Sequence, residues 1–524
     1  MERRVVIVGA GVSGLLACKY TIEKGFNPIV FEAESSVGGV WLTHTIKSTK
    51  LQNTRPGYRF SDFDWPSPPE GDDGFPTHTE VLEYIKAYAW NFELLPHIRL
   101  NCQVTGIQYL GETVEEMEAW DRWGGTGTAF GSAGRWHVSV HNKETDSMEV
   151  HQAEFVILCI GRFSGLPNIP ELPPEKSIER FRGKVLHSME YSALDDSMAA
   201  ELIKGKRITI VGSEKSAVDI AAECADANGV EYPCTMIQRT PHWFLPDVFL
   251  WGVHIGYIYC NRFAELLVHK PSESFLHSLF ATLLSPLKWG ISKFSESYLR
   301  WKLPLKKYGM IPSHSFLEEV SSCTISMLPK NFYDKVEKGS IVLKRSRGFG
   351  FVEEGIILEG EDQPIRADFV ILATGYKGDQ KLVNMFESPI FQKYIARSPT
   401  STVPLYRQTI HPRIPRLAII GYAEGLSNLP LFEIRCQWLA QFLDGKFDLP
   451  SIKEMEKDVK VWENHMKQYA GRNFWRSCIG VSNIWANDQL CRDMGCNPRR
   501  KNGFLAEWFQ PYGTTDYVGL ASEY

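Results

Sequence analysis

Short apolar runs rich in β-branched residues recur along the chain, and each is followed closely by a glycine or a charged residue. Such runs are typical of strands buried on both faces of a parallel sheet. Between them, apolar positions at the helical period predict helices, for example over residues 15–20, 79–91 and 431–443. This alternation predicts an α/β fold. The predicted strands are residues 5–8, 28–31, 155–160, 207–211, 235–238, 368–373 and 417–420.

The first predicted strand runs directly into a glycine-rich loop and a helix. Gly9 allows a tight turn, Gly11 lets the backbone approach a pyrophosphate, and Gly14 lets the helix pack closely on the strand. The free N–H groups at the helix N-terminus favour phosphate binding. The residues predicted to bind a dinucleotide here are Gly9, Gly11, Val12, Ser13 and Gly14.

An acidic residue, Glu32, ends the second strand of this unit and can accept hydrogen bonds from a ribose 2′-hydroxyl. A glycine pair, Gly38 and Gly39, follows at a distance typical of two-domain flavoproteins that bind FAD. FAD is therefore favoured over NAD at this first site. We predict that Gly39, Val40 and Trp41 also contribute to it.

A second β-α-β unit begins near residue 207, after a proline-rich stretch. Its loop keeps Gly212, whereas Glu214 and Ala217 stand at the other two glycine positions and give the backbone less freedom to approach a phosphate. The next strand ends at Arg239 instead of an acid, which suits a 2′-phosphate and favours NADPH over NADH. The residues predicted to hold NADPH are Gly212, Ser213, Lys215, Ser216 and Arg239.

The chain of 524 residues is too long for one hydrophobic core. We predict two Rossmann-like dinucleotide-binding domains, for FAD and NADPH, with the second inserted in the first and an added helical region. Because residues 368–376 resemble residues 155–161, they are interpreted as the crossover back into the first domain, and Thr374 and Gly375 as cofactor contacts. The predicted parts are an FAD domain at 1–165 and 366–450, an NADPH domain at 166–365, and a helical, turn-rich tail at 451–524.

Residues from about 250 to 305 are aromatic and apolar with scattered charges, which predicts helices with one apolar face. The favoured interpretation is helices packed on the second domain. A lid over a substrate tunnel and a contact with a membrane surface remain as alternatives. The sequence lacks an uncharged apolar run of roughly eighteen residues, so no membrane-spanning helix is expected.

Composition excludes several classes of function. The net charge of −5, without a concentrated basic tract, argues against nucleic-acid binding. Eleven cysteines occur without C-x-x-C or metal-ligand spacing, so we expect reduced thiols, no metal site and no flavin disulfide reductase. The first strand follows the initial methionine almost at once, leaving no room for a signal peptide. A cytoplasmic location is predicted, with peripheral attachment to the endoplasmic reticulum as an alternative.

Four motifs carry a resemblance to a known family. The segment FRGKVLHSMEY at 181–191 fits the signature F-x-G-x-x-x-H-x-x-x-Y/F of flavin-containing monooxygenases. The glycine loop at 9–14, GGVW at 38–41 and ATGY at 373–376 occur around it in family order. Further segments, including RTPHW at 239–243 and HSFLE at 314–318, are similar to the plant branch that contains the pathogen-responsive N-hydroxypipecolate synthase.

This resemblance implies an FAD- and NADPH-dependent monooxygenase. NADPH would reduce the flavin, O₂ would add to it, and a C4a-hydroperoxyflavin would oxygenate a small nucleophile, with the protein binding, orienting and excluding water. The preferred reaction is N-hydroxylation of a small amine or an amino-acid-like metabolite such as pipecolate, in plant specialised or defence metabolism. Family members often carry an asparagine near the flavin. Gln52 falls at that place and Asn53 beside it, and either one can face the ring.

The substrate is less clearly indicated than the cofactors. Arg407 could bind a substrate carboxylate, and Asn428 or Glu433 could face its amine, although ordinary structural ion pairs would explain the same residues. An S-oxygenating or Baeyer–Villiger monooxygenase would use the same cofactors. A flavoprotein reductase and a flavin-binding protein without catalysis are less favoured, because C-x-x-C is missing and the signature at 181–191 is present.

Overall fold

The computed structural model describes residues 3–68, 72–398 and 400–520. Two five-stranded parallel sheets form its frame, and each is built from the buried apolar runs of the sequence. In spatial order, the first sheet contains β20 (Leu417–Ile419), β7 (Phe155–Leu158), β1 (Val5–Val8), β2 (Ile29–Phe31) and β3 (Ile98–Arg99). The second contains β15 (Ile341–Arg345), β10 (Cys234–Gln238), β9 (Ile208–Val211), β19 (Phe369–Leu372) and β8 (Lys184–His187).

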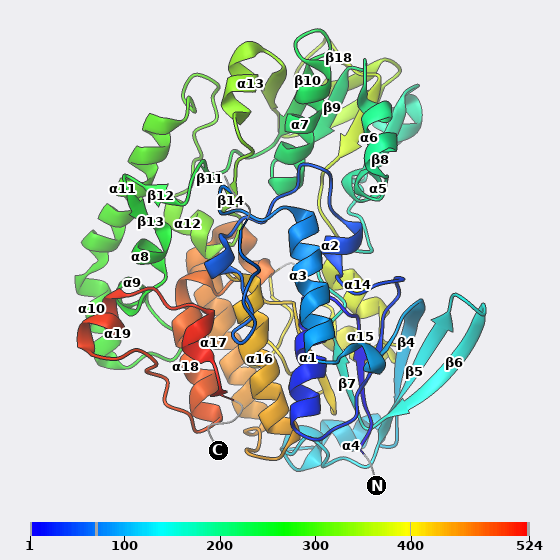
Figure 1. The fold of residues 1–524 in the computed structure, drawn as a ribbon, viewed down its shortest axis with the longest axis vertical. Helices are drawn as coiled ribbons and strands as arrows, with labels where there is room; N and C mark the ends of the chain where they lie inside the picture. Colours follow the sequence, from blue (N-terminus) through cyan, green and yellow to red (C-terminus); the bar gives the residue numbers. More distant parts are fainter. Residues whose placement is uncertain (1–2, 69–71, 399, 521–524) are drawn as a thin grey trace.

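The second sheet is inserted between β7 and β20 of the first, which confirms the predicted fold class. Figure 1 shows the second sheet at the top of the molecule and the first below it. The predicted boundary at residue 366 is wrong, because β19 pairs with β9 and β8 in the second sheet. β7 and β19 have similar sequences since each lies buried in a parallel sheet, so their likeness does not show which sheet they join.

Helices cover both faces of the first sheet. The helix α1 (Val12–Glu23) packs against α16 (Asn428–Leu443), and both are almost wholly buried. A capping box at Thr77 starts α3 (His78–Asn91), whose buried face joins the same core. Other helices of this half are α2 (Val40–Thr43), α4 (Val114–Glu118), α14 (Gly378–Asn384) and α15 (Pro389–Ile395). An antiparallel sheet of β4 (Cys102–Leu110), β5 (Arg135–Asn142) and β6 (Ser147–Ala153) packs against the first sheet.

The second sheet carries its own core around α7 (Lys215–Asn228). Smaller elements surround it, including the short parallel pair of β11 (Phe244–Leu245) and β14 (Ser326–Met327). The others are α5 (Ser188–Ser192), α6 (Asp196–Ile203), α13 (Phe332–Lys338), β16 (Phe349–Val352), β17 (Gly355–Leu358) and β18 (Ile365–Arg366). The hairpin of β12 (Phe249–Leu250) and β13 (Val253–His254) lies with the helices of the region at 250–305.

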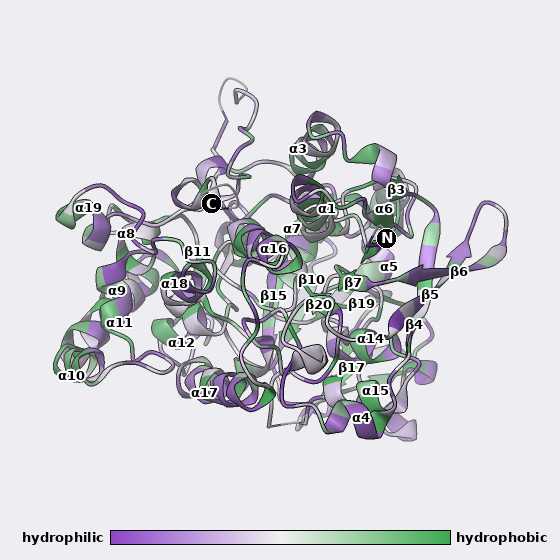
Figure 2. Cartoon of the chain, turned by 90° about the horizontal axis from the view of Figure 1, so that it is seen from below, coloured by the Kyte–Doolittle hydropathy of each residue, from purple (hydrophilic) through white to green (hydrophobic). Residues whose placement is uncertain are grey.

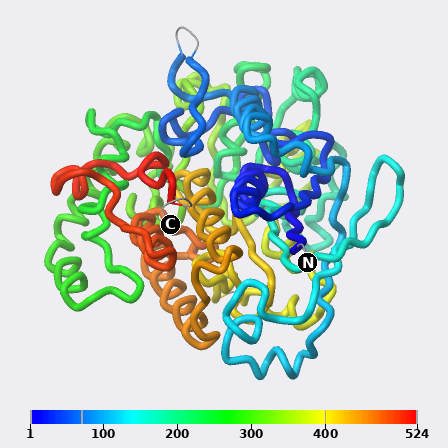
Figure 3. The backbone as a smooth tube through the Cα atoms, turned by 60° about the horizontal axis from the view of Figure 1, so that its bottom comes forward, coloured from blue at the N-terminus to red at the C-terminus, as the bar shows by residue number. Residues whose placement is uncertain are grey.

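The predicted helical region at 250–305 is confirmed, but its favoured packing partner is wrong. Its core joins Tyr259 and Leu299 to Tyr469 and Val481 of the C-terminal part, so these helices pack on the C-terminal part more than on the second sheet. Figure 3 shows the C-terminal helices between this region and the first domain. The elements are α8 (Ile255–Tyr259), α9 (Arg262–Leu266), α10 (Phe275–Leu283), α11 (Ser285–Lys302) and α12 (Phe316–Ser321), then α17 (Ile452–Ala470), α18 (Asn483–Asp493) and α19 (Phe504–Phe509).

Candidate functional site

A cavity of about 1450 Å³ lies where the two sheets, the helical region and the C-terminal part meet. Its wall includes the first glycine loop, the loop after β7, the segment from Cys323 to Met327 and the start of α16. Pockets for drug-sized ligands commonly measure roughly 300–1,000 Å³. The cavity is therefore large enough for a dinucleotide together with a further small molecule.

The first glycine loop leaves no room for side chains where the chain turns. Gly9 has φ +99°, and a Cβ there would lie 2.6 Å from the carbonyl oxygen of Cys159. A Cβ on Gly14 would lie 1.8 Å from the carbonyl oxygen of Gly9. At Gly11 the nearest atom, Cα of Gly39, would be 3.4 Å away, an ordinary contact. The structure thus brings the two predicted glycine segments together in the cavity wall, with Gly38 N–H donating to the Ala10 carbonyl at 3.1 Å.

The carboxylate of Glu32 holds the backbone of this loop. Its oxygens accept the N–H of Ala10 at 2.6 Å and the N–H of Glu34 at 3.0 Å. Burial raises the pKa of Glu32. Glu32 also lines the cavity. Val12, Ser13, Val40 and Trp41 line the same part of the cavity.

Gln52 and Asn53 both line the cavity, but they are fixed to different parts of the molecule. The side-chain oxygen of Gln52 accepts the N–H of Met327 in β14 at 2.9 Å. The amide of Asn53 donates to the Leu426 carbonyl just before α16 at 3.2 Å. Gln52 therefore connects the first domain to the β11–β14 pair, whereas Asn53 stays close to the start of α16.

The second loop has the shape of a dinucleotide turn but carries charged side chains. Gly212 has φ +152°, and a Cβ there would lie 2.3 Å from the Ala373 carbonyl oxygen. Glu214 precedes α7 at its N-cap position without a side-chain cap bond and, with Lys215, lines the cavity. The Lys215 ammonium pairs with Asp219 at 2.6 Å. Ser213 and Ser216 flank Glu214, and Arg239 is exposed after β10. Outside the cavity lining, Gly212, Ser213, Ser216 and Arg239 follow the carboxyl ends of β9 and β10.

Thr374 and Gly375 do not line the cavity. The Thr374 hydroxyl donates to the Asn168 carbonyl at 2.6 Å, and Asn168 N–H donates to the Gly375 carbonyl at 2.9 Å. These bonds join the chain segment that leaves the first sheet to the segment that returns to it. Both residues therefore fasten the connection between the sheets, and the structure gives them no place in the cavity wall.

The assignment of Arg407 to the substrate is wrong. Its guanidinium lies outside the cavity lining and is buried against acids, with Nε donating to Asp493 at 2.8 Å and Nη1 to Gln489 at 3.0 Å. Asp458 lies 3.4 Å from the same group. Arg407 is therefore a structural residue that ties the loop before β20 to α17 and α18.

The assignment of Glu433 to the substrate is also wrong. This residue is 2% exposed and faces α1 within the first domain. Its carboxylate accepts the Tyr20 hydroxyl at 2.9 Å, and the hydroxyl and N–H of Ser61 at 2.8 and 3.0 Å. Burial raises the pKa of Glu433 to about 7. Asn428, by contrast, lines the cavity at the start of α16, where its side-chain oxygen accepts Gly425 N–H at 3.0 Å.

The buried carboxyl of Glu433 makes stability depend on pH. An acid whose folded-state pKa is raised contributes stability below its unfolded pKa, and that contribution is lost as pH rises through the folded value near 7. We expect Glu433→Gln to reduce the difference in unfolding free energy between mildly acidic and mildly alkaline buffer by about 2 kcal/mol. Urea unfolding in both buffers measures it, and an unchanged difference would show that Glu433 is not the buried acid responsible.

Lys381 was missed by the sequence analysis although it lines the cavity. Its ammonium donates to the Ser164 hydroxyl at 3.0 Å, in the loop after β7, and burial lowers its pKa to about 8. Arg476 was missed as well, and it lines the cavity from the C-terminal part. Each is a single basic residue without a surrounding motif, so the sequence offers no signal that would mark either one.

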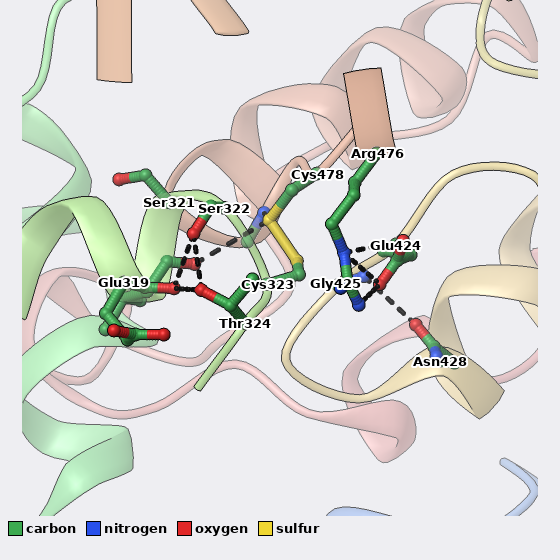
Figure 4. Close-up of a disulfide and its surroundings, with 12 residues drawn as sticks. Glu319, Ser321, Ser322, Cys323, Thr324, Glu424, Gly425, Asn428, Arg476 and Cys478 are labelled. Carbon is green, nitrogen blue, oxygen red and sulfur yellow. Dashed lines mark hydrogen bonds and ion pairs between the residues drawn. A yellow bond between two sulfur atoms is a disulfide. The ribbon is translucent and has the colours of Figure 1, made fainter. Parts of the chain in front are cut away.

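A disulfide between Cys323 and Cys478 contradicts the prediction of reduced thiols for this pair. The two residues are 155 positions apart, and Cys323 lines the cavity. Figure 4 shows the disulfide and its surroundings. The bond connects the segment between α12 and β14 with the C-terminal part. Spacing could not reveal it, because no motif links two cysteines so far apart. Within the described residues, the other nine cysteines form no disulfide.

Two segments singled out in the sequence, at 239–243 and 314–318, meet beside the cavity wall. The carboxylate of Glu319 accepts a ring nitrogen of His242 at 2.9 Å, the N–H of Trp243 at 3.0 Å and a ring nitrogen of His314. Within the described ranges, these two histidines and Glu319 form a group that could hold a metal ion. The hydrogen bonds already occupy the carboxylate, and the absence of a metal site stays a prediction.

Comparisons with known proteins agree with this geometry. The profile of a family described as "FMO-like: Flavin-binding monooxygenase-like" matches residues 2–506. The chain is 42% identical to a probable flavin-containing monooxygenase 1 of Arabidopsis thaliana, over 98% of this chain and 96% of the relative.

Solved structures share the fold at low sequence identity. An S-allyl-L-cysteine S-oxygenase from Allium sativum has a TM-score of 0.58 at 17% identity, over 94% of this chain and 89% of the other. A protein called OTEMO, solved in complex with FAD and NADP, has a TM-score of 0.62 at 17% identity, over 94% and 98% of the two chains.

Proposed function

Since the chain belongs to the flavin-binding monooxygenase-like family, we propose that it N-hydroxylates a small amine or amino-acid-like metabolite, such as pipecolate. As a flavin-containing monooxygenase it is an oxidoreductase that depends on NADPH and O₂. The observation that carries the proposal is that the glycine loops of the first domain line the same cavity as Asn53 and Asn428. The resemblance of several sequence segments to the plant branch with the N-hydroxypipecolate synthase supports the substrate class.

The residues of the first domain fit FAD. Gly11 and Gly39 pack closely against each other beside the N-terminus of α1, and Glu32 lines the same cavity with a carboxylate that can accept a ribose hydroxyl. In the second domain, Lys215 and Arg239 stand at the helix start and strand end where a phosphorylated dinucleotide is held. The bound cofactors supply hydride transfer and oxygen activation. The complex of OTEMO with FAD and NADP supports both assignments.

The chain's own contribution is to orient the substrate and exclude water. Asn53 and Asn428 present amides near the start of α16, and the helix N-terminus favours an anionic group such as an amino-acid carboxylate. Leu51 and Leu426 supply apolar surface in the same wall. A dry, fixed environment of this kind protects reactive oxygen from water.

The experiment is product analysis under ¹⁸O₂ with NADPH and three substrates offered separately: pipecolate, a thioether amino acid and a cyclic ketone. We expect one labelled oxygen on the nitrogen of pipecolate. Label only on sulfur would favour the alternative that the garlic S-oxygenase suggests. Label only in a lactone would favour a Baeyer–Villiger reaction, and either result would contradict the proposed N-hydroxylation.

A peripheral membrane contact is the second part of the proposal. No helix in the described segments is long and apolar enough to cross a membrane. However, α10 exposes a face of Phe275, Leu276, Leu279, Phe280 and Leu283, with Phe275 80% exposed. Further exposed apolar residues are Leu287 and Trp289 at the start of α11 and Phe504 and Leu505 on α19. Figure 2 shows α9, α10, α11 and α19 at one end of the molecule.

The helix α11 also carries the basic residues Lys293, Arg300 and Lys302, the last two in its final turn. Aromatic and leucine side chains next to basic residues suit the surface of an anionic membrane. We expect the protein to float with vesicles that contain phosphatidylserine, and Phe275→Ser with Trp289→Ser to reduce the bound fraction several-fold. Trp90→Ser is the matched control, because Trp90 is 75% exposed on α3. Equal flotation of the wild type, the variant with both Phe275→Ser and Trp289→Ser, and the Trp90→Ser control would contradict this contact.

A further inference from the structure

One short turn of the C-terminal part faces the second dinucleotide unit with two arginines. This 3-10 turn, η6 (Gly471–Arg476), follows α17 directly. Arg476 Nη1 lies 3.1 Å from the carboxylate of Glu214, the residue at the N-cap position of α7. Arg472 Nη2 lies 3.5 Å from the hydroxyl of Thr240, the neighbour of Arg239 after β10. The two arginines thus reach the helix start and the strand end of the same β-α-β unit.

The guanidinium of Arg476 is held firmly in place. It pairs with the buried carboxylate of Glu424, which follows β20, at 2.7 Å. Arg162 donates to the carbonyl of Arg476 at 2.7 Å. Two residues further on, Cys478 is bonded to Cys323. Figure 4 shows the disulfide, Glu424 and Arg476 close together. The side chain of Arg476 is only 10% exposed, so its position is fixed by the protein around it.

Glu214 occupies a place that a dinucleotide fold reserves for a phosphate. In such folds the pyrophosphate lies at the N-terminus of the helix after the glycine loop, and a 2′-phosphate lies beyond the end of the next strand. Glu214 replaces the second glycine of that loop, so its carboxylate lies at the helix start next to Arg476. Its side chain is 51% exposed and is free to turn toward solvent, unlike that of Glu424.

We propose that η6 completes the NADPH site, an inference that rests on the proposed function. Arg476 receives the pyrophosphate when the Glu214 carboxylate swings away, and Arg472 joins Arg239 around the 2′-phosphate. Glu424 stays paired with Arg476 and keeps the guanidinium oriented. Because Glu214 stands at the second glycine position, the loop makes fewer contacts with the phosphates. The arginines of the C-terminal part supply these contacts instead.

The test is a calorimetric titration of the oxidised, flavin-loaded enzyme, once with NADP⁺ and once with NAD⁺. Losing a charge-assisted bond to a phosphate weakens binding about tenfold or more. We expect Arg476→Gln to weaken both ligands by about that factor. Arg472→Ala should weaken only NADP⁺, because NAD⁺ has no 2′-phosphate. Glu214→Gln should tighten both ligands, since it removes the competing carboxylate. Arg366→Ala, an exposed arginine on β18, is the matched control.

The outcomes separate this inference from the broader proposal. Misfolding would not explain a tighter complex, so the gain expected for Glu214→Gln keeps the test decisive, and flavin absorbance verifies each variant. Wild-type affinity for both ligands in Arg476→Gln and Glu214→Gln would overturn the role of Arg476, and equal loss of NADP⁺ and NAD⁺ binding in Arg472→Ala would overturn that of Arg472. If the wild-type enzyme bound neither dinucleotide, the proposed cofactor use itself would be contradicted.

Discussion

The Gly11→Ala protein is expected to fold but to purify without flavin. The new Cβ would lie 3.4 Å from Cα of Gly39, an ordinary contact, and Gly11 has φ −75°, which alanine adopts without strain. The methyl group would instead stand in the cradle where the backbone approaches a pyrophosphate. Losing several phosphate contacts should weaken FAD binding by about 100-fold or more. The flavin-to-protein absorbance ratio of the purified protein measures how much FAD the variant retains.

Gly290→Ala is the matched control for this change. Gly290 lies within the helix α11, and a Cβ there would meet no atom within 4 Å. Alanine is also the better helix former, so this variant should remain fully yellow and at least as stable as the wild type. If Gly11→Ala retained a full complement of FAD, the first glycine loop would not be the flavin cradle.

The Arg407→Ala protein is expected to lose about 3–5 kcal/mol of stability, because breaking a buried ion pair leaves uncompensated charge. Asp493 and Asp458 would both lose their cation, in a region where Arg407 is 13% exposed. The KM for the substrate should stay unchanged, since Arg407 lies outside the cavity lining.

Denaturant unfolding and steady-state kinetics on the same preparation separate the two effects of Arg407→Ala. Lys446→Ala offers a comparison, because Lys446 is paired only with the partly exposed carboxylate of Asp444, 3.9 Å away. This variant should lose less than about 1 kcal/mol of unfolding free energy. A selective rise in KM at wild-type stability would restore Arg407 to the substrate site.

Local patterns predicted most of the frame. The strands around Val5–Val8 and Ile208–Val211 follow from buried apolar runs, and the turns at Gly9 and Gly212 follow from positive φ angles that only glycine adopts easily. These features depend on neighbouring residues alone. The sheet to which β19 belongs depends on pairing with β8 and β9, and neither the apolar run nor its glycine specifies a partner.

The parts of the site that the sequence did not predict come from distant segments. Lys381, Arg476 and the bond from Cys323 to Cys478 reach the cavity only because α14 and the C-terminal part fold against the first domain. Arg407 and Glu433 show the converse error. A charged residue in an apolar stretch resembles a ligand-binding group, yet here each satisfies buried partners inside the protein.

The most direct measurement is to reduce the flavin with NADPH without oxygen and then mix with O₂ in a stopped-flow spectrometer. We expect bleaching by NADPH, then a transient near-ultraviolet band that differs from both reduced and oxidised flavin and decays faster when the substrate is present. Direct return of oxidised flavin without that band, at a rate indifferent to substrate, would contradict oxygen transfer by this protein.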